Sequence, residues 1–269
     1  MACAAAAVAL LTACSGSPGS APQGAGTPIA PTRTPTPTET IPPDPPPPPP
    51  ERACYRLGYD AVLAPTSNAR QIDCTRPHTA VAFYVGSYDK SLKVDSRAVH
   101  QQEATVCPRK LADFVGGGVE DRRLSMLRTV WFTPTVGQAA KGAHWFECVA
   151  IALRGDQSLA ILRYRVAGAL DHADGRAAYG LCGSAEPGSP GFEQRICSNP
   201  HTWRAVRTVD FPAGPYPGED QVRSAGQSPC KDAGRGASSD PLNFRWSYQW
   251  PSSEQWRAGQ TYGVCWVPS

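Results

Sequence analysis

Short segments rich in apolar residues predict several β-strands after residue 52. The segments that read as strands are 80–85, 127–132, 145–153, 203–209 and 262–267. In a further segment, 244–250, aromatic residues alternate with polar ones, which predicts a strand with one aromatic face. That face is either half-buried core or a platform for carbohydrate, and the core is the commoner arrangement.

Residues 96–115 have the periodicity of an amphipathic helix. Val99, Val106, Cys107, Leu111 and Phe114 fall on one face of it. Ser96 is suited to cap its start and Gly116 to end it. In the second half of the chain Pro229 precedes Cys230, and we expect it to break any helix there.

Beyond residue 52 the chain repeats itself. Eight cysteines form two sets of four, and the second and third members of each set are 33 positions apart. The string Cys74-Thr-Arg-Pro-His-Thr corresponds to Cys197-Ser-Asn-Pro-His-Thr. Before the last cysteine of each set, Pro134, Gln138, Gly142, Trp145 and Cys148 match Pro251, Gln255, Gly259, Tyr262 and Cys265.

These repeats predict two tandem homologous modules at 53–170 and 177–269. Each module is expected to follow the order β-β-α-β-β, with a mainly antiparallel sheet and its own disulfides, so the fold class is α+β. The polar segment 171–175 between the modules is expected to be a turn, because it lacks the ligand pattern of a calcium loop. We expect each module to fold on its own.

The cysteines are expected to form a disulfide framework in an oxidising compartment. The two sets are Cys54, Cys74, Cys107, Cys148 and Cys182, Cys197, Cys230, Cys265. Four cysteines allow three pairings in each module. We favour first with second and third with fourth, because the first two lie on neighbouring strands and a helical cysteine can reach the last strand.

The N-terminus predicts export. A short apolar run is followed by Leu11-Thr12-Ala13-Cys14, which is similar to the lipobox of bacterial lipoproteins. The resemblance implies a signal peptide at 1–13, removed in the mature protein, and a lipid on Cys14 that anchors it to the extracytoplasmic face of the cell membrane. The alternative is an ordinary signal peptide.

Residues 14–52 are rich in Pro, Thr and Ser and are expected to form a disordered linker. The segment is either a spacer for the folded part or a Pro-rich ligand for a partner. The net charge of +3, from 26 basic and 23 acidic residues, gives no case for binding nucleic acid.

The two Pro-His strings and the later P-x-x-x-Q-x-x-x-G-x-x-aromatic-x-x-C strings resemble the septum formation-related domain. Trp256 and Gly259 fit its pattern, whereas Ala139 replaces the expected tryptophan in the first copy, and Thr79 and Thr202 replace an acidic residue. The resemblance implies an extracytoplasmic, membrane-tethered protein associated by name with septum formation.

The turns Pro77-His78 and Pro200-His201 are the most conspicuous candidate residues. Each imidazole either binds a ligand or hydrogen-bonds backbone carbonyls and holds the turn beside a disulfide, and we favour the second interpretation. We expect no metal site, because two histidines in separate modules would need close approach and additional carboxylates.

The sequence contains no G-x-S-x-G, H-E-x-x-H or C-x-x-C motif. We therefore expect no catalytic residues, no cofactor and a binding or scaffolding role, with an envelope protein or cell-wall component as partner. The alternative is an extracytoplasmic hydrolase or thiol enzyme with an unrecognised site.

Overall fold

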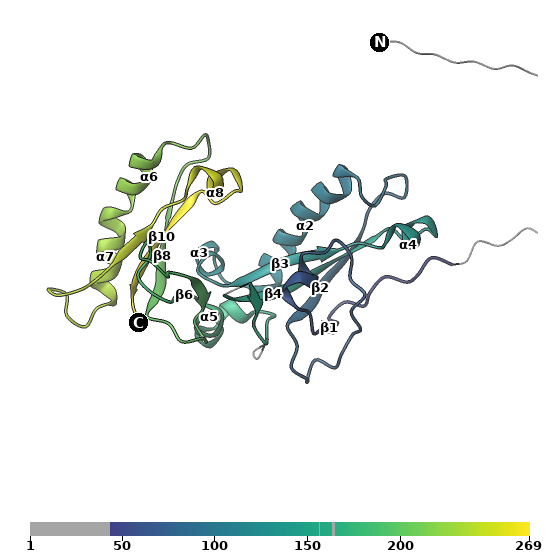
Figure 1. The fold of residues 1–269 in the computed structure, drawn as a ribbon, viewed down its shortest axis with the longest axis horizontal. Helices are drawn as coiled ribbons and strands as arrows, with labels where there is room; N and C mark the ends of the chain where they lie inside the picture. The colour runs from purple at the N-terminus through teal and green to yellow at the C-terminus, as the bar shows by residue number, and fades with distance from the viewer. Residues whose placement is uncertain (1–43, 156, 163–164) are drawn as a thin grey trace, which may run out of the picture. The chain divides into compact units, whose positions relative to one another are not determined.

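Ten strands form two antiparallel sheets in the described chain (Figure 1). The computed structural model describes residues 44–155, 157–162 and 165–269. The first sheet has the order β1-β2-β4-β3, and β5 pairs with β4. Its strands are β1 (Cys54–Tyr55), β2 (Ala80–Ser87), β3 (Leu127–Phe132), β4 (Trp145–Gly155) and β5 (Ser158–Leu159).

The second sheet has the order β7-β6-β8-β10-β9. Its strands are β6 (Leu181–Gly183), β7 (Gln194–Ile196), β8 (Trp203–Asp210), β9 (Ser247–Gln249) and β10 (Tyr262–Pro268). The helices are α1 (Tyr59–Val62), α2 (Arg97–Val115), α3 (Val119–Arg123), α4 (Val136–Ala140), α5 (Ala173–Tyr179), α6 (Glu219–Ala225), α7 (Gln227–Ala237) and α8 (Ser253–Arg257), with a 3₁₀ turn η1 (Ala169–Asp171). The expected α+β class with antiparallel sheets is confirmed.

Helix α2 begins and ends where the sequence predicts. The Ser96 side chain accepts a hydrogen bond from the Val99 amide, which satisfies one of the free N–H groups of the first turn. Gly116 follows the last turn with φ 73°, a backbone conformation that glycine adopts without steric cost. The helix packs across β2, β3 and β4.

Two expectations about local structure are wrong. Pro229 does not prevent a helix, because it is the third residue of α7, where the missing N–H would have had no helical partner. The segment 171–175 is not a simple turn either. It spans the end of η1 and the start of α5, and the Asp171 carboxylate accepts a hydrogen bond from the Gly117 amide at 2.8 Å.

Strand β4 lies in the middle of the first sheet and is buried on both faces. Phe146 and Cys148 pack with residues of α2, whereas Val149 and Ile151 pack with β1 and β2 on the opposite face. This alternation follows the two-residue period of a strand.

A shared hydrophobic cluster joins the two sheets. The described residues from Asp44 to Ser269 belong to one compact unit. Two backbone hydrogen bonds of 2.7 Å also join the segment before β3 to the segment at the start of β6. The Met126 amide donates to the Tyr179 carbonyl, and the Leu181 amide donates to the Leu124 carbonyl. The cluster includes Val115, Met126, Leu127 and Ala150 on one side and Tyr179, Leu181, Trp203, Val264 and Trp266 on the other.

The eight cysteines after residue 52 form four disulfides. The bonds are Cys54–Cys74, Cys107–Cys148, Cys182–Cys197 and Cys230–Cys265. In each set the first cysteine bonds to the second and the third to the fourth, the pairing that the sequence favours. Cys14 and the signal peptide lie outside the described residues, and none of the described helices is both long and apolar enough to span a membrane.

The end of the Pro-rich segment lies against the first sheet. Pro45 to Pro48 line a pocket of about 440 Å³ together with Tyr84 and Trp145. The Arg52 amide donates a hydrogen bond to the Ala82 carbonyl at 3.0 Å.

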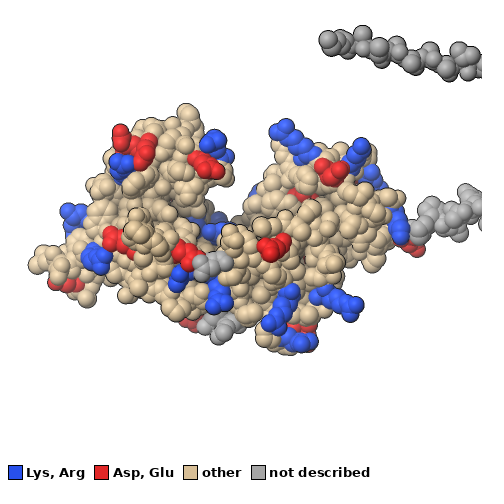
Figure 2. Space-filling model, in the orientation of Figure 1, with Lys and Arg blue, Asp and Glu red and all other residues tan. Residues whose placement is uncertain are grey.

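Basic and acidic side chains are interspersed on the face seen in Figure 2, where neither sign forms a large patch.

Candidate functional site

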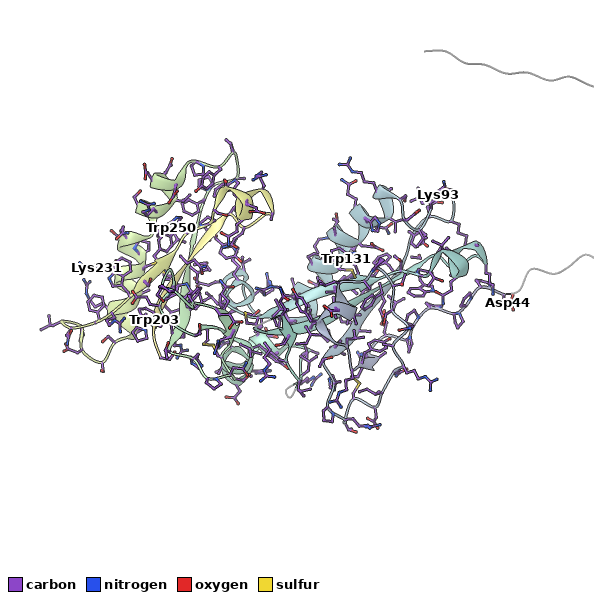
Figure 3. The ribbon with its side chains drawn as sticks, in the orientation of Figure 1. Asp44, Lys93, Trp131, Trp203, Lys231 and Trp250 are labelled. Atoms are coloured by element: carbon purple, nitrogen blue, oxygen red, sulfur yellow. A yellow bond between two sulfur atoms is a disulfide. The ribbon has the colours of Figure 1, made fainter. Side chains whose placement is uncertain are left out.

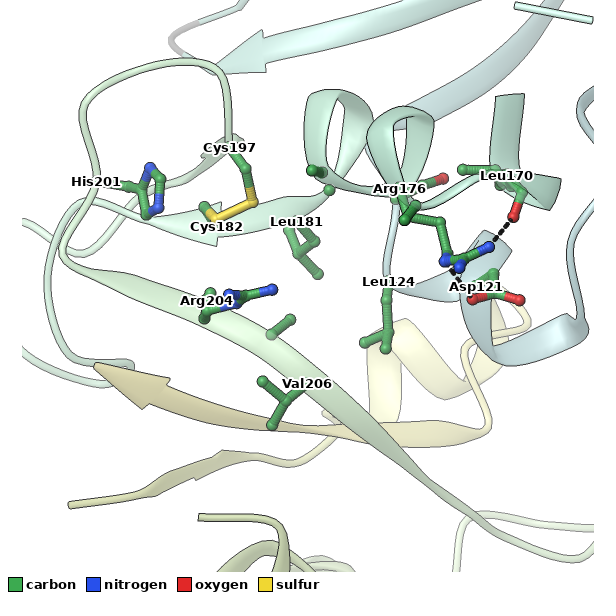
Figure 4. A pocket seen from close by; sticks show the side chains of 15 residues that line it. Asp121, Leu124, Leu170, Arg176, Leu181, Cys182, Cys197, His201, Arg204 and Val206 are labelled. Carbon is green, nitrogen blue, oxygen red and sulfur yellow. Dashed lines mark hydrogen bonds and ion pairs between the residues drawn. A yellow bond between two sulfur atoms is a disulfide. The ribbon is translucent and has the colours of Figure 1, made fainter. Parts of the chain in front are cut away.

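A pocket of about 590 Å³ lies where α5 and β6 face α3 and β8 (Figure 4). Its walls are mainly apolar, and one of them carries the Cys182–Cys197 disulfide. The charged or titratable residues among those that line it are Asp121, Arg176, His201 and Arg204. Two arginines and a histidine therefore surround the pocket with a single carboxylate.

Asp121 and Arg176 already form hydrogen bonds and an ion pair within the fold. The Asp121 carboxylate accepts a hydrogen bond from the Gly118 amide at 2.8 Å and lies 3.7 Å from Arg176 Nε. Arg176 also donates from Nη1 to the Leu170 carbonyl at 2.7 Å. These contacts fix the turn between α2 and α3 to the start of α5 and leave little charge for a ligand.

Arg204 is the cation available to a ligand. It lies on β8 opposite Cys182 of β6, so the sheet register places it beside the disulfide. Its guanidinium points into the pocket in Figure 4 and has no hydrogen bond or ion pair with any described residue. Since it is exposed and unpaired, it can pair with an acidic group from outside.

His201 lies beside the same disulfide. Its Nδ1 is 2.8 Å from the carbonyl oxygen of Asn199, so this nitrogen carries the proton and donates, and Nε2 is left as an acceptor. The ring and the two sulfurs are close enough together to suggest a metal site. However, a cysteine binds a metal as its thiolate, and the two sulfurs here are joined in a disulfide. The cluster therefore does not fit a metal centre.

A comparison with known protein families gives a match over most of the described chain. Residues 51–265 match, in one continuous stretch, the family described as Septum formation. The chain belongs to the septum formation family. No curated protein and no solved structure matches it.

Only one of the two Pro-His turns borders this pocket. His78 does not line the pocket, but its ring makes the same contact as that of His201, with Nδ1 2.8 Å from the Arg76 carbonyl oxygen. Both turns lie next to a disulfide, Cys54–Cys74 or Cys182–Cys197. These contacts agree with the interpretation that the histidines hold the turns.

The aromatic strand packs into the core of the second sheet. Tyr248 is 6 % exposed and packs with Cys230 of α7 and Cys265 of β10. Trp246 and Trp250 lie against the same cluster. The geometry therefore favours the core interpretation over a carbohydrate platform.

Sequence reasoning missed Arg204 and Arg176, because no motif surrounds them and the pocket forms only when distant segments meet. It also missed Glu147, which is 3 % exposed on β4 and accepts a hydrogen bond of 2.7 Å from the Tyr55 hydroxyl. Burial raises the pKa of Glu147 to about 6, against the opposing effect of the Tyr55 hydroxyl. Its place in an otherwise apolar run, between Phe146 and Cys148, was the available signal.

Proposed function

We propose that this member of the septum formation family is an exported protein, anchored by a lipid on Cys14 to the extracytoplasmic face of the cell membrane. In this proposal it acts in septum formation as a non-catalytic binding or scaffolding protein. Residues 53–170 and 177–269 are two copies of one β-β-α-β-β module. The partner is an envelope protein or cell-wall component that presents an acidic group.

Export is supported by the four disulfides, because such bonds persist in oxidising compartments and are rare in a reducing cytosol. The lipid anchor is supported by the string Leu11-Thr12-Ala13-Cys14. The Pro-rich segment between Cys14 and residue 44 also fits a lipid anchor, because it places a spacer between the anchor and the described sheets.

The two-copy interpretation is supported by matching details at equivalent places. Each module has a capping box before its last strand, formed by Thr135 with Gln138 and by Ser252 with Gln255. A glycine with positive φ follows each of these helices, Gly142 at 96° and Gly259 at 97°. The residue opposite the last cysteine is aromatic in both sheets, Trp131 and Tyr248.

The single observation that supports binding is the unpaired guanidinium of Arg204 in a pocket with apolar walls. A buried or half-buried apolar surface with one free cation recognises an acidic group by pairing and burial, without a reacting atom. The groups that a thiol enzyme or hydrolase would use are engaged elsewhere. The pocket cysteines are bonded to each other, and the Ser125 hydroxyl donates to the Arg122 carbonyl at 2.9 Å.

The anchor is tested by cell fractionation and detergent partitioning of the Cys14→Ala variant. Wild-type protein should enter the detergent phase, and the variant should be released from the membrane or mislocalised. Equal membrane retention of both proteins contradicts the lipid anchor.

Binding is tested by crosslinking in the intact envelope, followed by purification of the wild type, Arg204→Glu and Arg257→Glu. Both variants make the same charge change at an exposed arginine, but only Arg204 lines the pocket. A partner that is recovered with the wild type and Arg257→Glu and lost with Arg204→Glu supports the proposal. Equal recovery with all three proteins contradicts it. A free thiol that alkylates before reduction would instead support the thiol-enzyme alternative.

A further inference from the structure

A carboxylate occupies the buried face of α2. Val99, Glu103 and Cys107 follow one another at intervals of four residues, and all three are 0 % exposed. Burial raises the pKa of Glu103, an effect that His100 opposes. Glu103 Oε2 lies 3.4 Å from His100 Nδ1, but Oε1 is buried without a hydrogen-bond partner. Leaving such an atom unpaired costs stability, so its retention calls for an explanation.

Glu103 lines a second pocket, of about 340 Å³, that lies apart from the Arg204 site. Its walls come from residues 62–65 at and after the end of α1, from residues 129–133 in and after β3, and from α2. Trp131 forms one side, beside α2 (Figure 3). At the rim Leu63 is 66 % exposed, which is unusual for a large apolar side chain.

The polar groups of this pocket mainly accept hydrogen bonds. Thr133 Oγ1 donates to the Pro65 carbonyl at 3.3 Å, and Thr129 Oγ1 donates to the Val130 carbonyl at 3.2 Å. Both hydroxyl protons are therefore used, and their oxygens remain as acceptors beside the Glu103 carboxylate. A ligand has to supply the donors, and an ammonium group supplies three of them together with the opposite charge.

The second module fills the equivalent space. Gly226 precedes the helical Cys230 by four residues, as Glu103 precedes Cys107. A Cβ at Gly226 would lie only 2.2 Å from the Tyr248 ring, so no side chain fits there. The Tyr248 hydroxyl donates to the Val222 carbonyl at 3.1 Å and completes the packing. The first module thus has an open pocket with a carboxylate at this place, whereas in the second module the Tyr248 ring fills the space and the carboxylate is absent.

We propose that the pocket over Glu103 binds a small primary amine. The ammonium group pairs with Glu103 Oε1, and the apolar body of the ligand lies against Leu63, Pro65 and Trp131. The pocket volume is near the lower end of the range for small-molecule sites, roughly 300–1,000 Å³, so the ligand is no larger than an aromatic or short aliphatic amine. This site is independent of the acidic partner proposed for Arg204.

The test uses the folded full-length protein with benzylamine as the probe and benzyl alcohol as its neutral match. Two-dimensional amide NMR follows the titration, and calorimetry gives the affinity. We expect benzylamine to shift amides of α2 and β3 around Glu103 and Val130, and to bind at least about tenfold more tightly than benzyl alcohol. Glu103→Gln should remove this preference, because it keeps the shape and loses the charge.

Glu147→Gln serves as the matched control, since it neutralises another buried carboxyl outside this pocket. It should bind benzylamine as the wild type does. Equal binding of benzylamine and benzyl alcohol by the wild type overturns the proposal, even if Glu103→Gln does not fold. Unchanged benzylamine affinity in a folded Glu103→Gln variant also overturns it, as does the lack of any shift in α2 and β3 at about 10 mM probe.

Discussion

At each Pro-His turn, one ring nitrogen is hydrogen-bonded to the carbonyl two residues earlier in the chain. The distance is 2.8 Å for His78 and for His201. A contact that recurs at both turns has a role in each of them, whereas a ligand site would need only one. Only His201 of the two lines the Arg204 pocket, yet both rings make this contact, which agrees with a structural role.

We predict that His78→Ala and His201→Ala each lower the free energy of unfolding by about 1 kcal/mol, the scale of one hydrogen bond. Urea unfolding followed by tryptophan fluorescence measures the change. His172→Ala is the control, because its ring has no hydrogen bond to a described residue, and it should leave stability unchanged. A His201 variant of unchanged stability that loses partner binding would assign the residue to the ligand site instead.

Glu147 predicts how stability depends on pH. Its folded pKa of about 6 is above the ordinary value of 4.5, so the folded state holds its proton more tightly than the unfolded state does. The protonated Glu147 carboxyl therefore adds to the free energy of unfolding below about pH 4. This contribution is lost as the pH rises through the folded pKa, and the free energy of unfolding falls by about 2 kcal/mol by pH 7.

Glu147→Gln should remove this component, because the amide oxygen still accepts the Tyr55 hydrogen bond and does not titrate. Melting temperatures between pH 4 and pH 7.5 should therefore fall less steeply in the variant than in the wild type. Parallel curves for the two proteins would show that the Glu147 carboxyl does not hold its proton more tightly on folding.

At the scale of single elements, the two short helices α4 and α8 end on a glycine that the chain requires. Gly259 has φ 97° and open space around a Cβ, so a side chain there would strain only the backbone. We predict that Gly259→Ala lowers stability by about 1–2 kcal/mol. Gly236→Ala, in α7 and also with open space, should be neutral or slightly stabilising, since its φ is ordinary. Thermal melts of the two variants compare them directly, and equal effects would contradict the argument.

Many of the helices, strands and disulfides could be predicted from the sequence. The bounds of α2 follow from its caps, and β3 follows from its correspondence with the aromatic segment of the other repeat. The cysteine pairing follows from which elements lie side by side. Helix α7 was missed because Pro229 was treated as a helix breaker, although a proline in the first turn loses no helical hydrogen bond.

The candidate sites were predictable only in part. His201 was found through its motif, whereas Arg204 and Glu103 were not, because their roles depend on segments that are distant in sequence. Glu103 had a signal, since it lies four residues from both Val99 and Cys107 on the apolar face of α2. An acidic residue on such a face indicates a special environment, but its unpaired oxygen is visible only in the folded chain.

For the whole molecule, the shared cluster links the stability of the two sheets. Residues 53–170 and 177–269, produced separately under oxidising conditions, should each form their own two disulfides. Each should unfold at a lower urea concentration than the joined chain, because Trp266 and Tyr179 lose their partners across the cluster. The joined chain should unfold in one transition by both fluorescence and circular dichroism. Two separate transitions, with midpoints equal to those of the isolated modules, would contradict this coupling.

The order of the disulfides also determines how far the protein can be stretched. The four bonds close loops of 20, 41, 15 and 35 positions, and no loop overlaps another along the chain. A pulling force applied at the two ends passes through each bond and bypasses its loop. Even complete mechanical unfolding therefore lengthens only the segments between the loops, by about 3.5 Å for each residue released. Between an anchor and a partner that move apart, the folded part would act as a tether of limited extension while its disulfides stay intact.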